Sequence, residues 1–367
     1  MLKTKARFTQ WCHQPLLRIL SPSWTKNLHF NRNYSTKSCN FSTSTANSTR
    51  EDPYLFFLNF DKNGKQLPKD EYLKQMKHMN NPFQQYEGIP TFFLHGLLGS
   101  GQNYVSIMNK YSDVLATNGS CLLLDSRNHG RSSHTTTMSY DDLSDDIITV
   151  MDELKLEKVN IVAHSMSGKA LMNLLLRESL NSISSPLLQR INKAIVVDVS
   201  PVDYTKDDRW VIKQYIDAMR GINLKTLKTR TEAEAILAKV GGISRDARLF
   251  LLTNLVRLKE DNNNDTAGWA WRCNLDVIEA YLPQIGSFPF KTREDALGMY
   301  QVPVQYLGDN ILFLRGAKSM YVTDHYEIIS KTFFPNATFN TVKNASHWIH
   351  IDNPHEFTTL ISEFVNT

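Results

Sequence analysis

A serine stands where a buried strand is expected to meet a helix. The stretch VNIVAHSMSGKALMNLLL (159–176) starts as a β-branched run and continues with apolar residues at helical spacing, and Ser165 lies at the junction. A tight strand-to-helix turn would raise the hydroxyl above the sheet, and only small residues fit two positions before and after it. Ala163 and Ser167 hold those positions in place of the usual glycines. This placement favours a nucleophile for acyl chemistry over the alternative, an ordinary loop serine.

A His-Gly pair supplies a second element of the same chemistry. The segment FFLHGLLGSGQNY (92–104) ends an apolar run and continues in a glycine-containing loop. Backbone amides in such a loop can face the negative charge that develops on a substrate carbonyl oxygen. We expect the amides of Leu97 and Met166 to form this oxyanion hole, and the alternative is a plain glycine-rich connector.

A histidine near the C-terminus is placed to act as a general base. His347 lies in NASHWIHIDNPHEF (344–357), after the last expected strand and before a helix that opens near Pro354. His350 and His355 are rivals in the same segment, but the Ser-His-Trp context favours His347. An imidazole that reaches Ser165 would take its proton during attack.

The acid that orients this histidine has two candidates. After the penultimate strand, RGAKSMYVTD places Ser319 where a carboxylate is usual, and Asp324 lies five residues further on. The preceding strand ends VVDVSPVDY, which puts Asp198 at the edge of the sheet close to the Ser165 turn. A buried carboxylate there could hold the His347 ring and stabilise its charged form. Asp198 is our choice, and Asp324 remains the alternative.

The elements that position these residues follow an alternating pattern. Amphipathic helical segments such as YDDLSDDIITVMDELKL (140–156) separate near-continuous apolar runs, which predicts a mostly parallel sheet covered by helices on both faces. The runs expected as strands are TFFLHG (91–96), CLLLDS (121–126), VNIVAHS (159–165), AIVVDVS (194–200), ILFLRG (311–316) and ATFNTV (337–342).

The pattern stops between about Pro201 and Tyr300, where TEAEAILAKV (231–240) and DARLFLLTNLVRL (246–258) are helical. We therefore expect an α/β core in two parts, 51–200 and 301–367, with an inserted helical lid at 201–300. Within the lid, Lys225, Lys228 and Arg230 form a solvated face or a site for coenzyme A phosphates. Trp269 and Trp271 either line an acyl or alcohol pocket or pack the lid.

The first 50 residues differ in charge from the rest of the chain. They contain eight of the 41 basic residues and no Asp or Glu, which leaves 33 basic against 37 acidic residues in the remainder. Apolar residues interspersed among Arg, Lys, Ser and Thr are typical of a mitochondrial transit peptide. RNYST (32–36) resembles a matrix-peptidase site, so we expect a transit peptide at 1–34, disorder to about residue 50, and a matrix location. The alternative is a disordered basic tail.

The remaining composition excludes several classes of protein. The mildly acidic body disfavours a nucleic-acid partner, and the sequence has no apolar stretch long enough for an integral membrane segment. The cysteines, Cys12, Cys39, Cys121 and Cys273, lack metal-ligand spacing and indicate a reducing compartment. We expect no metal and no bound cofactor. Asp125, Arg127 and His129 in DSRNHGRS are expected to tie a loop together.

Together, HGLLGS, DSRNHGRSS, AHSMSGKA, VVDVSPVDY, FLRGAKSMYV and SHWIHIDNP resemble the α/β-hydrolase family that contains abhydrolase-domain protein eleven, small bacterial esterases and yeast ethanol acetyltransferase. The resemblance runs from about residue 54 to the C-terminus. It implies an α/β-hydrolase fold and a triad acid on the strand after the nucleophile, which supports Asp198. The transit-peptide composition and Asn-rich loops make the chain most similar to the mitochondrial ethanol acetyltransferases of yeast.

The resemblance implies a serine-dependent acyltransferase with the triad Ser165, Asp198 and His347. We expect it to make ethyl acetate from acetyl-CoA and ethanol through an acyl-serine, with acetyl-CoA as a substrate rather than a cofactor. Short esters and thioesters would be hydrolysed as a side activity. Two alternatives remain: a short-chain carboxylesterase or thioesterase without alcohol transfer, and a catalytically silent binding protein.

Overall fold

The structure, a computed structural model, describes residues 55–61, 63–66, 88–115, 119–181, 185–207, 210–258, 268–291 and 304–367. The expected transit peptide at 1–34 and the segment to about residue 50 lie outside these ranges.

A seven-stranded sheet forms the centre of the fold. Its strands lie in the order β1-β3-β2-β4-β5-β8-β9, and every neighbouring pair is parallel except β1 and β3. All six expected strands are present, and an antiparallel edge strand, β1, is added. The strands are β1 (Phe57–Phe60), β2 (Thr91–Leu94), β3 (Cys121–Leu124), β4 (Val159–His164), β5 (Ile191–Val197), β8 (Ile311–Gly316) and β9 (Thr338–Val342).

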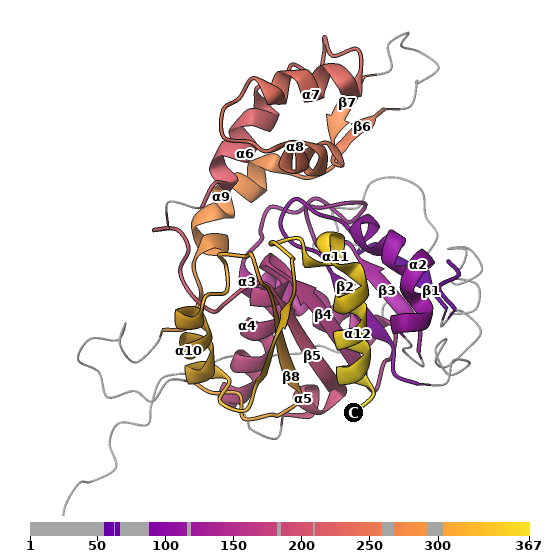
Figure 1. Ribbon diagram of the computed structural model, residues 1–367, viewed down its shortest axis with the longest axis vertical. Coiled ribbons are helices and arrows are strands. Elements are labelled where there is room, and N and C mark those ends of the chain that lie inside the picture. The colour runs from indigo at the N-terminus through magenta and orange to yellow at the C-terminus, as the bar shows by residue number, and fades with distance from the viewer. Residues whose placement is uncertain are drawn as a thin grey trace, which may run out of the picture. The chain divides into compact units, whose positions relative to one another are not determined.

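Helices pack on both faces of this sheet, as Figure 1 shows. The apolar side chains of α3 (Tyr140–Glu153), α4 (Met166–Asn181) and α10 (Asp324–Phe333) cluster with one face. Those of α2 (Val105–Leu115) and α12 (Pro354–Val365) cluster with the other. Because both faces are covered, the inner strands β2, β3, β4 and β8 are buried at nearly every position, whereas the edge strand β9 exposes Thr338 and Thr341. Three short helical segments complete the core: η1 (Gly101–Tyr104), α5 (Pro186–Arg190) and α11 (Ile349–Asp352).

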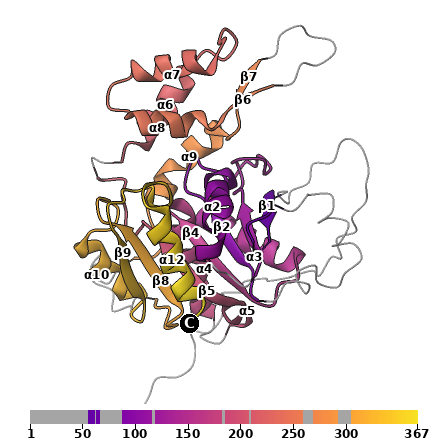
Figure 2. The same ribbon diagram turned by 45° about the vertical axis from the view of Figure 1, so that its right-hand side comes forward.

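The interval between β5 and β8 forms a lid, which we define as the described residues from α6 to α9. Its helices are α6 (Ile212–Arg220), α7 (Arg230–Ala238), α8 (Arg245–Leu252) and α9 (Leu275–Gly286). The expected helix at 246–258 ends at Leu252, and a short antiparallel pair follows, β6 (Leu255–Arg257) with β7 (Trp269–Trp271). Figure 2 shows α6, α7, α8 and the β6–β7 pair gathered beyond one end of the strands, with α9 returning to the core.

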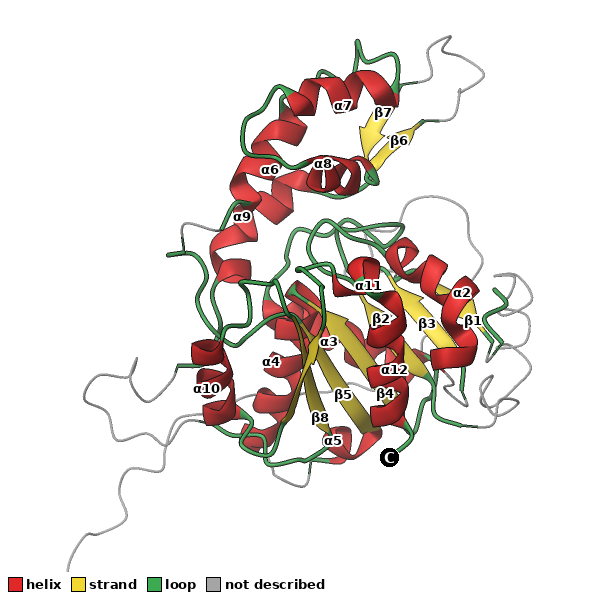
Figure 3. Cartoon of the chain, in the orientation of Figure 1, coloured by secondary structure: helices red, strands yellow, loops and turns green. Residues whose placement is uncertain are grey.

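Side-chain caps fix where several of these helices begin. Ser139 accepts a hydrogen bond from the Asp142 amide at the start of α3, and the Asp142 side chain accepts one in return from the Ser139 amide. Ser244 caps α8 and Asn274 caps α9 in the same way as Ser139 caps α3. Such caps satisfy amides that lack a partner within the helix. Loops crowd the side of the sheet that faces the lid (Figure 3). Ser165, Asp198 and His347 lie in turns or bends that follow β4, β5 and β9.

Candidate active site

Ser165 lies on a strained turn between β4 and α4. Its φ of 52° is in the left-handed region, which a serine adopts at a cost of order 1–3 kcal/mol. The turn is held because the Ser165 amide donates to the Val197 carbonyl at 2.9 Å. A Cβ on Gly168 would lie 2.7 Å from Val199 Cγ1, so the helix can approach β5 this closely only with glycine there.

Ser167 replaces the glycine usual at this turn and has a partner of its own. Its hydroxyl donates to the His95 carbonyl at 2.6 Å, and the residue is 3% exposed. Ser167 therefore joins the Ser165 turn to the loop that follows β2. The serine fits because its polar atom, which would otherwise be buried without a partner, is satisfied.

His347 lies between β9 and α11 and contacts both other residues of the expected triad. Its Nε2 lies 3.1 Å from Ser165 Oγ, and its Nδ1 lies 2.7 Å from Asp198 Oδ2. The His347 ring packs against the ring of Tyr321, with centroids 4.3 Å apart. His164 Nε2 donates to the His347 carbonyl at 2.9 Å, which holds the backbone of this loop.

Asp198 follows β5 directly and is fully buried. Its Oδ1 accepts from the Gly316 amide at 2.9 Å, while Oδ2 accepts from His347 and from the Ser319 hydroxyl. Hydrogen bonds of this number and kind stabilise a buried carboxylate. Ser319, at the position where a carboxylate is usual, thus supports an acid supplied by the neighbouring strand.

The alternative acid and the rival histidines have other partners. The Asp324 side chain is 91% exposed and pairs with Arg315 at 2.6 Å. Burial lowers the pKa of His350 to about 4, and its ring packs against Tyr104 with centroids 5.0 Å apart. The ring of His355 lies against Tyr111 on the opposite side of the sheet from α4. His350 lines the same cavity as Ser165, but the histidine within hydrogen-bond distance of the Ser165 hydroxyl is His347.

The expected oxyanion-hole amides border the same cavity as the Ser165 hydroxyl. Leu97 and Met166 both line it, and within the described residues neither backbone amide has a hydrogen-bond acceptor. Gly96 brings the loop against Ser165, since a Cβ there would lie 3.0 Å from Ser165 Cβ. Two free amides beside a nucleophile are the arrangement that stabilises an oxyanion.

The loop 125–137 packs against the loop that follows β2 and helps to hold it in place. Asp125 accepts from the Gly101 amide at 2.6 Å and from the Arg131 amide at 2.8 Å. Arg127 forms a bidentate pair with Asp146, with both distances 2.7 Å. Burial lowers the Arg127 pKa, but the hydrogen bond and charge of Asp146 outweigh it and raise the pKa overall. These contacts agree with the expectation that Asp125 and Arg127 of DSRNHGRS hold this loop in place.

A lid-covered cavity of about 290 Å³ surrounds the Ser165 hydroxyl. Its wall is mainly aromatic and aliphatic. The lid contributes Ile212, Tyr215, Phe250 and Ile285, the segment before it contributes Trp210, and the core contributes Leu97, Met166, Val199, Tyr321 and Trp348. Trp269 and Trp271 do not line it; they pack against the apolar cluster of the lid.

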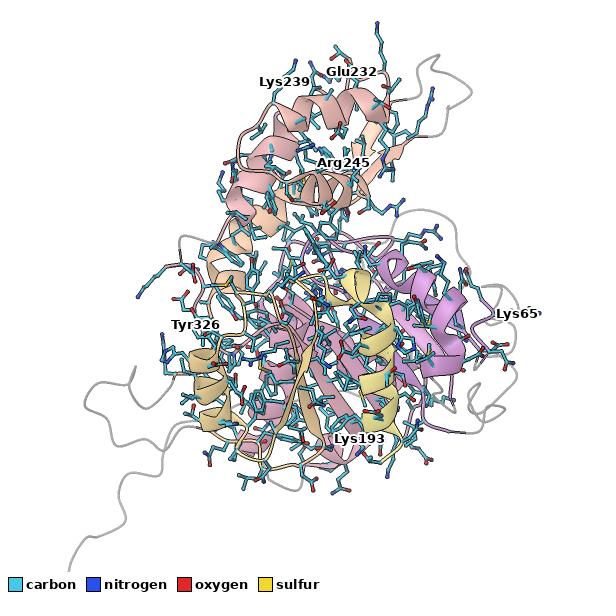
Figure 4. All side chains as sticks on the ribbon, viewed as in Figure 1. Lys65, Lys193, Glu232, Lys239, Arg245 and Tyr326 are labelled. Carbon is cyan, nitrogen blue, oxygen red and sulfur yellow. The ribbon has the colours of Figure 1, made fainter. Side chains whose placement is uncertain are left out.

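The basic lid residues also lie away from this wall. Lys225, Lys228 and Arg230 are exposed and do not line the cavity. Figure 4 shows Glu232 and Lys239, at the two ends of α7, on the part of the lid farthest from the sheet. A solvated face therefore accounts for these residues in the structure.

Three further features concern possible metal sites, membrane-spanning helices and cysteines. In the part of the chain that the structure describes, no group of three or more His, Cys, Asp or Glu side chains could hold a metal ion. No helix among those residues is long and apolar enough to cross a membrane. Cys121 and Cys273 are both buried.

One supporting residue, Ser319, can be noticed in the sequence, and another, His164, cannot. Ser319 was conspicuous because it stands where an acid is usual, although its contact with Asp198 could not be foreseen. His164 gave no signal, since a histidine ending a buried strand has no characteristic spacing to His347. Its role depends on a contact 183 residues away.

A Ser–His–Asp arrangement on loops at one edge of a parallel sheet, under a lid, defines a serine-type hydrolase. Residues 90–354 match the family described as alpha/beta hydrolase fold, and the chain belongs to that family. It is 33% identical over 276 residues to the sn-1-specific diacylglycerol lipase ABHD11 of Mus musculus, covering 74% of this chain and 80% of that protein.

Two other relatives extend the comparison. A protein of Saccharomyces cerevisiae named "Probable alcohol acetyltransferase" is 28% identical over 289 residues, covering 75% of this chain and 77% of that protein. The solved structure of a marine microorganism esterase has a TM-score of 0.65 at 30% identity, covering 85% of this chain and 100% of that one. The protein is therefore a serine hydrolase-type enzyme with lipase and esterase relatives.

Proposed function

We propose that this enzyme is an alcohol O-acetyltransferase that makes ethyl acetate from acetyl-CoA and ethanol through an acetyl-Ser165 intermediate. The observation that carries the proposal is the Ser165–His347–Asp198 chain of contacts, 3.1 Å and 2.7 Å long, inside an apolar cavity under a lid. The similarity to the yeast protein named as an alcohol acetyltransferase supports the choice of acceptor. Esterase and thioesterase activity follow from the same intermediate.

In the first half-reaction, His347 Nε2 takes the Ser165 proton as Oγ attacks the acetyl carbonyl carbon. Asp198 holds the ring through Nδ1 and stabilises the imidazolium, while the Leu97 and Met166 amides donate to the oxyanion. The carbon–sulfur bond then breaks, the coenzyme A thiolate receives the proton from His347, and the acetyl group remains on Oγ.

In the second half-reaction, His347 takes the hydroxyl proton of ethanol as its oxygen attacks the acetyl carbon. Collapse of the tetrahedral intermediate breaks the bond to Oγ and releases ethyl acetate, and Ser165 regains the proton from His347. Water can replace ethanol in this step, and acetate is then the product.

The competition between ethanol and water depends on the lid. Burying the two carbons of ethanol contributes at most about 0.8 kcal/mol each, or roughly tenfold in all, which is small against bulk water. The aromatic wall formed by Trp210, Phe250 and Trp348 supports transfer because it leaves water few polar partners in the cavity. The proposal therefore includes hydrolysis as a competing outcome.

We also propose that the protein acts in the mitochondrial matrix. The basic, acid-free composition of residues 1–50 supports this location. Import of the full chain into isolated mitochondria, with shortening near Tyr34, is the expected result. A chain that stays outside and keeps its full length would contradict the location.

The proposal is tested by incubating the full-length protein with acetyl-CoA and ethanol and measuring ethyl acetate, acetate and free thiol. Ethyl acetate that disappears in Ser165→Ala supports transfer. Acetate without ethyl acetate would reject it in favour of a short-chain esterase or thioesterase, the function to which the lipase and esterase relatives point. No product, together with no labelling of Ser165 by a fluorophosphonate, would instead indicate a silent binding protein.

A further inference from the structure

Both backbone polar groups of Leu98, in the loop that carries the expected oxyanion hole, are held by side chains. The Leu98 amide donates to His129 Nε2 at 3.1 Å, and the Leu98 carbonyl accepts from Asn254 Nδ2 at 2.7 Å. Leu98 has a φ of 60° and is 1% exposed. A non-glycine residue in this conformation persists only where its surroundings hold it, and these two side chains do so.

The chemistry of the partners fixes how each side chain is oriented. Asn254 Nδ2 faces the carbonyls of Leu98 and Leu251, which only accept, so the amide nitrogen and not its oxygen must point there. His129 Nδ1 faces the Arg127 carbonyl at 3.0 Å and must carry the proton, which leaves Nε2 to accept from Leu98. Both contacts with Leu98 therefore have a donor opposite an acceptor.

The two side chains come from different parts of the molecule. His129 belongs to the core loop 125–137, whereas Asn254 lies in the lid, between α8 and β6, and is 2% exposed. The Leu98 side chain packs into the apolar cluster of the lid together with Leu251 and Leu255. Leu98 is thus a core residue whose carbonyl and side chain are both fixed by the lid.

The lid segment around Asn254 is itself docked on the core loop. The Asn254 carbonyl accepts from the Arg272 amide at 2.8 Å, and the Arg272 carbonyl lies 2.9 Å from His134 Nε2. The Asn274 amide donates to the Asn128 carbonyl at 2.9 Å. These bonds connect the lid, the 125–137 loop and the loop that carries the expected oxyanion hole. The position of Asn254 therefore depends on how the lid packs on the core.

We propose that Asn254 is a positioning residue through which a seated lid holds the oxyanion hole in its reactive shape. The Leu97 amide is one residue from the carbonyl that Asn254 binds, so release of Leu98 would let that amide turn away from the carbonyl oxygen of the substrate. Acyl transfer at Ser165 then depends on how the lid is seated on the core. The inference rests on the proposed acyl-serine chemistry, but not on ethanol as acceptor.

The test compares Asn254→Ala with a matched control, Thr253→Ala, in the full-length protein. Thr253 is the exposed neighbour, and its hydroxyl bonds only locally to the Phe250 carbonyl. Hydrolysis of p-nitrophenyl acetate gives kcat and KM, and a trifluoromethyl ketone, which forms an oxyanion on Ser165, gives an inhibition constant. Asn254→Asp keeps the shape of the side chain and removes the donor.

Removal of an oxyanion-hole donor costs about 10²–10³ in kcat, and displacement of one should cost roughly tenfold to a hundredfold. We expect that loss of kcat in Asn254→Ala and Asn254→Asp, with KM within about threefold and the inhibition constant of the ketone raised in proportion. Thr253→Ala should match the wild type.

The inference would be overturned if Asn254→Ala kept its kcat, or if its KM alone rose while the ketone bound as before. Either result would mean that Asn254 only packs the lid. Because the readout is ester hydrolysis, a wild-type enzyme that makes no ethyl acetate would defeat the choice of acceptor and leave this test intact.

Discussion

Replacing Asp198 by Asn separates the two candidate acids, and the structure predicts how the variant fails. The carboxylate receives three donors: the Gly316 amide on Oδ1, and His347 Nδ1 and the Ser319 hydroxyl on Oδ2. An amide side chain offers one acceptor oxygen and one NH₂ group. It must therefore present its NH₂ to one of these donors.

The favoured orientation of the new amide inactivates His347. If its oxygen keeps the Gly316 bond, its NH₂ faces His347 Nδ1, which must then be unprotonated, and Nε2 carries the hydrogen and cannot take the Ser165 proton. The opposite orientation places NH₂ against the Gly316 N–H, and the unsatisfied donors cost about 1–3 kcal/mol. In either orientation the asparagine also lacks the negative charge that stabilises the His347 imidazolium.

The two effects together predict a loss in kcat of about a thousandfold to ten-thousandfold for Asp198→Asn. Asp324→Asn is the matched control, because that side chain is 91% exposed and bonds only to surface groups; its kcat should stay within about twofold of the wild type. The assay is p-nitrophenyl acetate hydrolysis, with circular dichroism to show that both variants fold. An Asp198→Asn enzyme within tenfold of the wild type, or an inactive Asp324→Asn, would refute the assignment.

Three further results are expected. Ser319→Ala removes one donor from Asp198 and should lower kcat roughly tenfold; a loss as large as that of Asp198→Asn would contradict this supporting role. Lys169→Met removes a buried ammonium that donates at 2.8 Å to three carbonyls flanking the lid, and urea unfolding should show a loss of about 2–4 kcal/mol; a change below about 0.5 kcal/mol would contradict it. Burial lowers the pKa of His350 to about 4. Below about pH 6.5 the unfolded chain therefore binds a proton at this histidine that the folded chain does not, and the free energy of unfolding decreases as the pH is lowered. Between pH 7 and pH 5, His350→Phe should lose about 2 kcal/mol less than the wild type, and an equal loss in both proteins would count against a neutral His350.

The parallel core was predictable because burial on both faces leaves a clear trace in sequence. Runs such as CLLLDS and AIVVDVS are apolar at successive positions, as strands buried on both faces are. β1 was not predicted, since FLNF is short and its pairing with β3 is antiparallel and distant in sequence. The sequence predicts a helix over β6 because TNLVRL continues the spacing of DARLFLL, and only pairing with β7 makes this segment a strand.

Some residues of the site could likewise be predicted from the sequence, and others could not. Ser165, His347 and Asp198 could be proposed from sequence because each follows a recognisable strand, and strands in a parallel sheet bring their carboxyl ends to one edge. The contacts of Asn254 and Lys169 could not be predicted from the sequence. Each depends on where the lid lies against the core, and no local pattern encodes a hydrogen bond between residues 156 apart, as Asn254 and Leu98 are.

The most direct test of the account is capture of the acylated enzyme. The full-length protein is mixed with acetyl-CoA, quenched in acid within the first turnover, digested and examined by mass spectrometry. The account predicts one added acetyl group on the peptide that contains Ser165, absent from Ser165→Ala and discharged as ethyl acetate when ethanol is added before the quench. Turnover without any acetyl group on Ser165, or acetylation that persists in the Ser165→Ala protein, would contradict it.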